Sequence, residues 1–252
     1  MLFRSLEIFQ AEEANRSFSA DLSHKPKLED IPRDMADPRW EKAGMLPFRI
    51  DDCYKRTLEQ IRKSRLTDKP GQFPRDEHAT KWAGMLAHYA ADNTMPLHAT
   101  IDYQAYSFFL NLEKSKKPKV HFDMEYVLVD GENEDYPALR EELWKHLQAA
   151  LSQMQRPAIS KDVWTTSVGI SLQSYDALSL IGNAARAAYL DSAGNLKAFD
   201  ADVFYHFAGK VNDAETTILQ MKARQLALAT KWVETLLLTA WQEANNKPNS
   251  PK

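Results

Sequence analysis

The sequence predicts an all-α protein folded as a single multi-helix domain. The 252 residues include only eight glycines, and few segments alternate apolar and polar residues as a half-buried strand does. Several long segments instead repeat apolar residues at the three- and four-residue spacing of one helix face. With 44% hydrophobic and 27% charged residues, the composition is that of an ordinary globular protein.

Charge and cysteine content narrow the functional classes. The formal net charge is −3, which gives no general attraction to phosphate backbones or anionic membranes. Phosphate recognition would therefore need a local site, such as a metal. Cys53 is the single cysteine, so no intramolecular disulfide forms. No stretch has the apolar core of a secretory signal or the roughly 20 apolar residues of a membrane span. As written, the chain is expected to be soluble and cytoplasmic.

The first half of the chain predicts two long helices separated by irregular segments. Residues 2–14 predict a short amphipathic helix, whereas the prolines and charges of residues 18–47 predict an irregular segment. Pro47 opens a helix that continues to about residue 64, and a loop covers residues 66–74. A second helix begins near Asp76. Its apolar side is formed by Trp82, Met85, Leu86 and Tyr89.

The second half predicts three further long helices. Residues 104–119 read as a short helix and a basic loop, and the composition of "VHFDMEYVLV" fits a helix or a strand. Long helical patterns then cover residues 136–154, 161–190 and 211–245. We predict one all-helical metal-binding domain over residues 1–247. The tail, residues 248–252, is expected to be disordered.

The stretch "HYAADNTMPLH" carries the first candidate metal ligands. His88 and Asp92 lie four residues apart, so a helix projects both side chains from one face. Pro96 ends that helix and lets the chain turn back, which presents His98 shortly afterwards. A core helix gains little from a stacked histidine and carboxylate, whereas a metal ion gains two ligands.

A second pair of the same kind follows in "HFDME". His121 and Glu125 are again four residues apart. Three imidazoles and two carboxylates suit zinc, which accepts histidine nitrogen and carboxylate oxygen. Each pair alone is more typical of a solvated contact on a helix face.

The order and spacing of the five residues carry more information than either pair. The pattern H-x3-D-x5-H, whose last histidine lies in Pro-Leu-His, followed by H-x3-E, resembles the zinc-dependent phospholipase C and single-strand-specific zinc nuclease superfamily. "LPFRIDDCYKRTLEQIR" and "ARQLALATKWVETLLLTAWQEANNKP" resemble the helix before this signature and the closing helix of bacterial members. The resemblance covers roughly residues 45–247.

The resemblance implies an all-helical fold and a zinc-dependent phosphodiester hydrolase. His98, His121 and Glu125 would hold one zinc ion, and His88 and Asp92 would contribute to a second. Asp92 would also bridge to a third ion and serve as the catalytic residue. A hydroxide activated by one to three zinc ions would attack phosphorus in single-stranded nucleic acid or a phospholipid head group.

The N-terminal third departs from the family pattern. Relatives complete the cluster with an N-terminal tryptophan and early histidines, but this chain has no tryptophan before Trp40 and only His24 before His78. Asp21 and His24 are candidate substitutes. Either the chain is an N-terminally shortened, impaired relative, or it has rebuilt the site. A shortened chain would place the natural protein in the periplasm or outside the cell.

Two other classes fit parts of the pattern. A non-catalytic zinc-binding helical module would use the metal only to tie helices together. A di-iron bundle would be expected to use Glu-x-x-His spacing, which this constellation lacks. Near the site, Asp102 and Tyr103 line its mouth or form an ordinary turn, and the segment 114–119 contacts phosphate or is a solvated loop. The aromatic residues form a substrate wall or belong to the core: Trp40, Tyr106, Phe108 and Phe109.

Overall fold

The structure is a computed structural model in which most described residues are helical. The described residues are 25, 27–37, 45–65, 77–100, 102–129 and 135–246. The mostly helical architecture confirms the all-α class. The expected helix 2–14, the candidates Asp21, His24 and Trp40, and the tail 248–252 lie outside the described residues.

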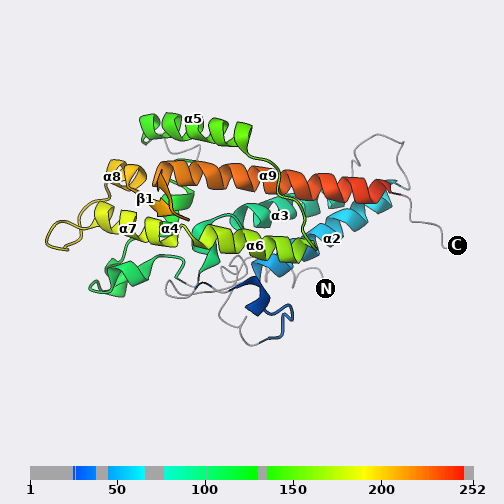
Figure 1. The fold of residues 1–252 in the computed structure, drawn as a ribbon, viewed down its shortest axis with the longest axis horizontal. Helices are drawn as coiled ribbons and strands as arrows, with labels where there is room; N and C mark the ends of the chain where they lie inside the picture. The colour runs from blue at the N-terminus through cyan, green and yellow to red at the C-terminus, as the bar shows by residue number, and fades with distance from the viewer. Residues whose placement is uncertain are drawn as a thin grey trace.

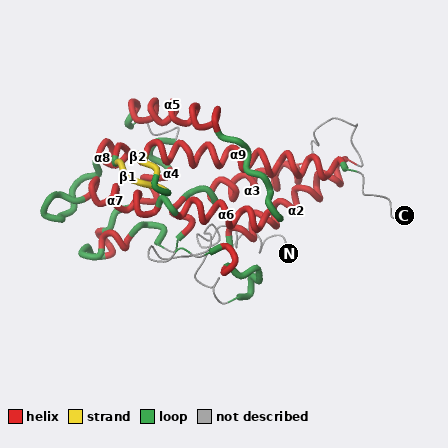
Figure 2. Tube along the Cα trace, in the orientation of Figure 1, coloured by secondary structure: helices red, strands yellow, loops and turns green. Residues whose placement is uncertain are grey.

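A long C-terminal helix, α9 (Ile218–Asn245), organises the fold (Figures 1 and 2). Helix α5 (Pro137–Gln153) packs on one side of α9, and α2 (Leu46–Arg65) and α3 (Glu77–Asp92) pack on the other. Apolar side chains of α2, α3 and α9 meet around the fully buried Trp232. Helices α2 and α3, the two long helices predicted in the first half of the chain, therefore form one face of the bundle.

A helix predicted over residues 161–190 is two helices, so that prediction is wrong in detail. Asp176 is the C-cap of helix α6 (Val163–Tyr175), and α7 (Leu178–Tyr189) begins two residues after it. Tyr175 and Leu178 are both buried. Because the chain stays apolar across the break, periodicity alone does not reveal it.

The prediction of a helix from residue 211 is also wrong, because a hairpin comes first. After α8 (Ala201–His206), strands β1 (Ala208–Val211) and β2 (Ala214–Thr217) pair antiparallel. Asn212 and Asp213 form the two-residue turn with φ of 50° and 64°, the left-handed conformation that asparagine and aspartate tolerate best after glycine. Helix α9 then begins with a capping box.

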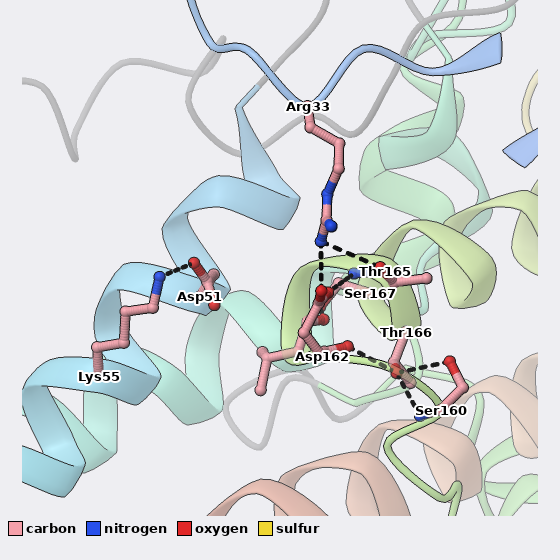
Figure 3. Close-up of polar contacts among 9 residues, drawn as sticks. Arg33, Asp51, Lys55, Ser160, Asp162, Thr165, Thr166 and Ser167 are labelled. Atoms are coloured by element: carbon pink, nitrogen blue, oxygen red, sulfur yellow. Dashed lines mark hydrogen bonds and ion pairs between the residues drawn. The ribbon is translucent and has the colours of Figure 1, made fainter. Parts of the chain in front are cut away.

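The segment 27–37 is anchored on the start of α6 (Figure 3). Arg33 donates to the carboxylate of Asp162 at 2.5 Å and to the hydroxyl of Thr165 at 3.2 Å. Asp162 is also the N-cap of α6, since it accepts from the Thr165 backbone N–H at 2.7 Å. Ile31 packs against Trp164. One carboxylate therefore both starts the helix and holds the preceding segment.

Short helical turns connect these elements. They are the 3-10 helices η2 (Leu28–Asp30), η4 (Pro96–Ala99), η5 (Tyr106–Phe109) and η6 (Lys114–Lys116), and the short helix α4 (Val120–Glu125). "VHFDMEYVLV" is thus helical at its start. Within the described part of the chain, every helix is too short or too polar to cross a bilayer.

Candidate metal centre

The break after α3 places His98 in the interior. Helix α3 ends at Asp92, and Pro96 occupies the first position of η4, where its missing N–H costs nothing. The His98 backbone N–H donates to the Met95 carbonyl at 3.0 Å. All four residues of η4 are buried, so the imidazole of His98 is fixed inside the bundle.

Helix α4 supplies the other two ligands from one face. His121 and Glu125 are one turn apart, while Val120 and Met124 are buried and fix the rotation of the helix. The ring of Tyr103 contacts the ring of His121 edge-on, with centroids 5.7 Å apart. The helix therefore presents an imidazole and a carboxylate toward η4.

The three side chains converge on one point. Glu125 Oε1 lies 2.9 Å from His98 Nε2, and Glu125 Oε2 lies 3.2 Å from His121 Nε2. The two Nε2 atoms are 3.1 Å apart. Zinc–nitrogen bonds near 2.0–2.1 Å put neighbouring tetrahedral ligands about 3.3 Å apart. Each of the three residues offers a ligand atom within 4.8 Å of the others, so the group could hold a metal ion.

The electrostatics of Glu125 favour its charged form. Burial alone would raise the pKa of this carboxyl, but hydrogen bonds from His121 and His98 outweigh burial and hold the pKa well below its usual range. An ionised carboxylate beside two imidazoles is the form that binds a cation.

His88 and Asp92 form a neighbouring pair. His88 Nε2 lies 3.4 Å from Asp92 Oδ2, and the His88 side chain is 59% exposed whereas that of Asp92 is 15% exposed. The pair is not part of the three-residue group. Asp92 Oδ2 is buried and has no hydrogen-bond partner among the described residues. Burial raises the pKa of Asp92, while the imidazoles of His98 and His88 oppose that shift.

Three residues on other elements, which the sequence did not single out, hold α4 in place. Tyr189 donates its hydroxyl to Asp123 Oδ2 at 2.6 Å, and Tyr205 donates to the Asp123 carbonyl at 2.5 Å. Lys222 Nζ donates to the Met124 carbonyl. Burial raises the pKa of Asp123 to about 6 and lowers that of Lys222 to about 7. These buried bonds fix the helix on which two candidate ligands lie.

Lys222 left a detectable signal in the sequence. It lies four residues after Ile218, and both are buried on α9. A lysine on the apolar stripe of a helix requires a polar partner inside the fold. The partner is a backbone carbonyl of a distant element, which no local pattern specifies.

The other residues considered near the site have ordinary structural partners. Asp102 accepts the backbone N–H groups of Tyr106 and Ser107 at 2.7 and 2.9 Å, so it satisfies the first two N–H groups of η5. Phe109 is a buried core residue, and the carbonyl of Tyr106 accepts from Lys117 at 3.1 Å. Tyr103, the other candidate for the site mouth, contacts the ring of the candidate ligand His121.

Comparison with models of protein families, with curated proteins and with solved structures finds no match to this chain. The resemblance to the phospholipase C and zinc nuclease superfamily therefore stays a prediction. The geometry of His98, His121 and Glu125 is an observation that does not depend on this resemblance.

Proposed function

We propose that the protein is a zinc-dependent phosphoric-ester hydrolase whose metal is held by His98, His121 and Glu125. The observation that supports this most strongly is the convergence of two imidazole Nε2 atoms and one carboxylate, at 2.9 to 3.2 Å, from segments 27 residues apart. Two histidines and a glutamate are a typical ligand set of catalytic zinc.

The number of ligands favours a catalytic site over a structural one. Structural zinc sites are closed by four protein ligands, whereas catalytic sites have three and an open position. When bound, zinc would polarise a phosphoryl oxygen and lower the pKa of a coordinated water. A diester of single-stranded nucleic acid or a phospholipid head group is the substrate class that the sequence pattern indicates.

Asp92 is the proposed catalytic residue. Asp92 and Glu125 line the same pocket, which lies between the end of α3, α4 and α9, so Asp92 lies beside a substrate bound at the metal. His88 Nε2 and Asp92 Oδ2 lie 3.4 Å apart, and together they would coordinate a second cation. Asp92 Oδ2 is buried and has no hydrogen-bond partner among the described residues beside this 3.4 Å contact with His88, and a cation between the two side chains would neutralise it.

The test is hydrolysis of bis(p-nitrophenyl) phosphate by zinc-loaded protein. We expect zinc-dependent turnover that falls at least about 100-fold in His98→Ala and in Asp92→Asn. His206→Ala is the matched control, because His206 contacts Glu142 on α5 and not the metal centre, and it should keep wild-type activity. Turnover that does not change when a chelator is added, or that persists in His98→Ala, would refute the hydrolase assignment.

A second candidate, a non-catalytic zinc module, is favoured by one observation. The three ligands contact one another directly and thereby tie η4 to α4, as a structural cross-link would. This alternative predicts stoichiometric zinc binding and a raised melting temperature without hydrolysis of any phosphodiester.

A further inference from the structure

Two aromatic rings are stacked on the exposed side of α4. Phe122 and Tyr126 lie one helical turn apart, and their ring centroids are 5.4 Å apart with an interplanar angle of 23°. Each residue is 50% exposed, so each ring turns one face to the other and leaves much of its remaining surface to solvent. The fold gains little from rings that stay half exposed, and this pair is therefore a candidate binding surface.

The ring pair borders the candidate metal ligands. Phe122 lies three residues before Glu125 on α4, so the two side chains are neighbours on the helix surface, with Cβ atoms about 5–6 Å apart. The charge of Glu125 raises the pKa of Tyr126, with smaller contributions from partial burial and from the charge of Asp92. The phenol therefore lies within electrostatic reach of both carboxylates. A group that stacks on these rings lies beside the metal centre.

A cation lies at the start of the same helix. Lys119 is exposed, directly precedes α4 and is three residues before Phe122. Two other lysines of the preceding loop are engaged: Lys116 pairs with Glu113 at 3.1 Å, and Lys117 donates to a backbone carbonyl at 3.1 Å. Positive charge beside aromatic rings is the combination that binds single-stranded nucleic acid, in which the bases stack and the phosphates pair with cations.

The size of this surface disfavours other partners. Helix α4 has six residues, whereas many helices that lie in the plane of a membrane have about 20–30. A protein interface buries about 800 Å² on each partner, and two half-exposed rings supply only a fraction of that area. The ring pair instead fits a single planar group, and bases stack on aromatic side chains through their flat faces.

We propose that Phe122 and Tyr126 form a stacking platform for a base of single-stranded nucleic acid, and that Lys119 contacts a phosphate of the same strand. The inference rests on the proposed function for its substrate: of the two substrate classes of the metal centre, it selects single-stranded nucleic acid over a phospholipid head group. A strand stacked on the rings places a phosphodiester beside Glu125. Such a platform tolerates any sequence, because every base has a flat aromatic face.

The test compares two fluorescein-labelled strands of equal length, about eight nucleotides. One is an oligothymidylate, and the other is an abasic strand that has the same phosphates without the bases. Each is titrated with chelator-treated full-length protein at low salt, and binding is followed by fluorescence anisotropy. We expect the wild type to bind the thymidylate strand at least about fivefold more tightly than the abasic strand.

Four variants assign the effect to residues. Phe122→Ala should weaken binding of the thymidylate strand about fivefold or more and leave binding of the abasic strand unchanged. Lys119→Gln should weaken both strands equally, because a phosphate contact does not depend on the base. Tyr126→Trp should keep the preference, because an indole ring also stacks. Trp144→Ala is the matched control: Trp144 is 56% exposed on α5, and its removal should change neither affinity.

The outcomes separate this inference from the proposed function. Absence of saturable binding of the thymidylate strand, equal affinity of the wild type for both strands, or an unchanged preference in Phe122→Ala would overturn the platform. Binding of phosphatidylcholine vesicles in place of the base preference, abolished in Phe122→Ala, would assign the rings to a lipid surface and also overturn it. The wild-type comparison decides the point even where a variant fails to fold.

The experiment contains no zinc and measures no hydrolysis. Loss of the base preference would therefore refute the platform and leave the hydrolase to its own assay with bis(p-nitrophenyl) phosphate. A base preference without zinc-dependent hydrolysis would leave the platform standing and refute only the hydrolase.

Discussion

The Nε2 atoms of His98 and His121 face each other at 3.1 Å. Without a cation, this contact is favourable only if one of the two Nε2 atoms carries a hydrogen and the other accepts it. A cation between them and Glu125 would satisfy both lone pairs and the carboxylate together. This relationship is the physical basis of the metal assignment.

Replacing Glu125 with glutamine should weaken zinc binding at least about tenfold, because the variant keeps the shape of the side chain but removes the charge that neutralises the cation. Isothermal titration with zinc measures this. Glu142→Gln is the matched control, since Glu142 also accepts from a histidine, His206 at 3.1 Å, but lies on α5. Equal losses in both variants would contradict a specific site.

Tyr189→Phe should affect both stability and zinc affinity. Removal of the hydroxyl leaves Asp123 Oδ2 buried without the donor it has at 2.6 Å, which costs about 1–3 kcal/mol in the free energy of unfolding. Because Asp123 holds α4, zinc affinity should fall about tenfold as well. Urea unfolding and zinc titration test the two effects. Tyr126→Phe, on an exposed ring, should change the free energy of unfolding little.

Lys222 predicts a stability that rises with pH. Burial lowers its folded-state pKa to about 7 from 10.5, so between these values the unfolded chain binds more protons than the folded one. The free energy of unfolding must then increase with pH over this window. Relative to Lys222→Met, the wild type should gain a few kcal/mol, about 1.4 per pH unit at most, between about pH 7 and pH 9.5. If the free energies of unfolding of the wild type and of Lys222→Met, measured with urea, change equally with pH, the lowered pKa of Lys222 is refuted.

The start of α9 should depend on its cap. Thr217 accepts the Gln220 backbone N–H at 3.2 Å, and Gln220 Oε1 accepts the Thr217 N–H at 3.2 Å. Thr217→Ala should therefore lower the free energy of unfolding by about 1 kcal/mol. Thr230→Ala, an exposed position within α9, provides the comparison in thermal unfolding. A larger loss of stability in Thr230→Ala than in Thr217→Ala would show that the cap does not stabilise the start of α9.

The sequence is most informative where the candidate ligands follow a local spacing. The i, i+4 pairs at His88 and His121 and the proline break before His98 were visible as patterns, and the structure brings His98, His121 and Glu125 together. Lys222 and Tyr189 were not predicted, because their bonds to α4 span 98 and 66 residues. Such bonds depend on how separate elements pack together, whereas helical periodicity describes a single helix.

The same reasoning explains the errors in the fold. The apolar pattern continues through Asp176, so one helix was predicted where two occur. At Asn212 and Asp213, tolerance for positive φ permits a hairpin turn but does not require it. In both places the local sequence allows two structures, and tertiary contacts select one.

Zinc content per chain tests the central claim most directly. Protein purified without a chelating tag is analysed for zinc as wild type, His98→Ala and His206→Ala, before and after equilibration with zinc. The account predicts at least one zinc ion per wild-type chain, its loss in His98→Ala and its retention in His206→Ala. A wild-type chain that contains no zinc and takes up none would contradict the account.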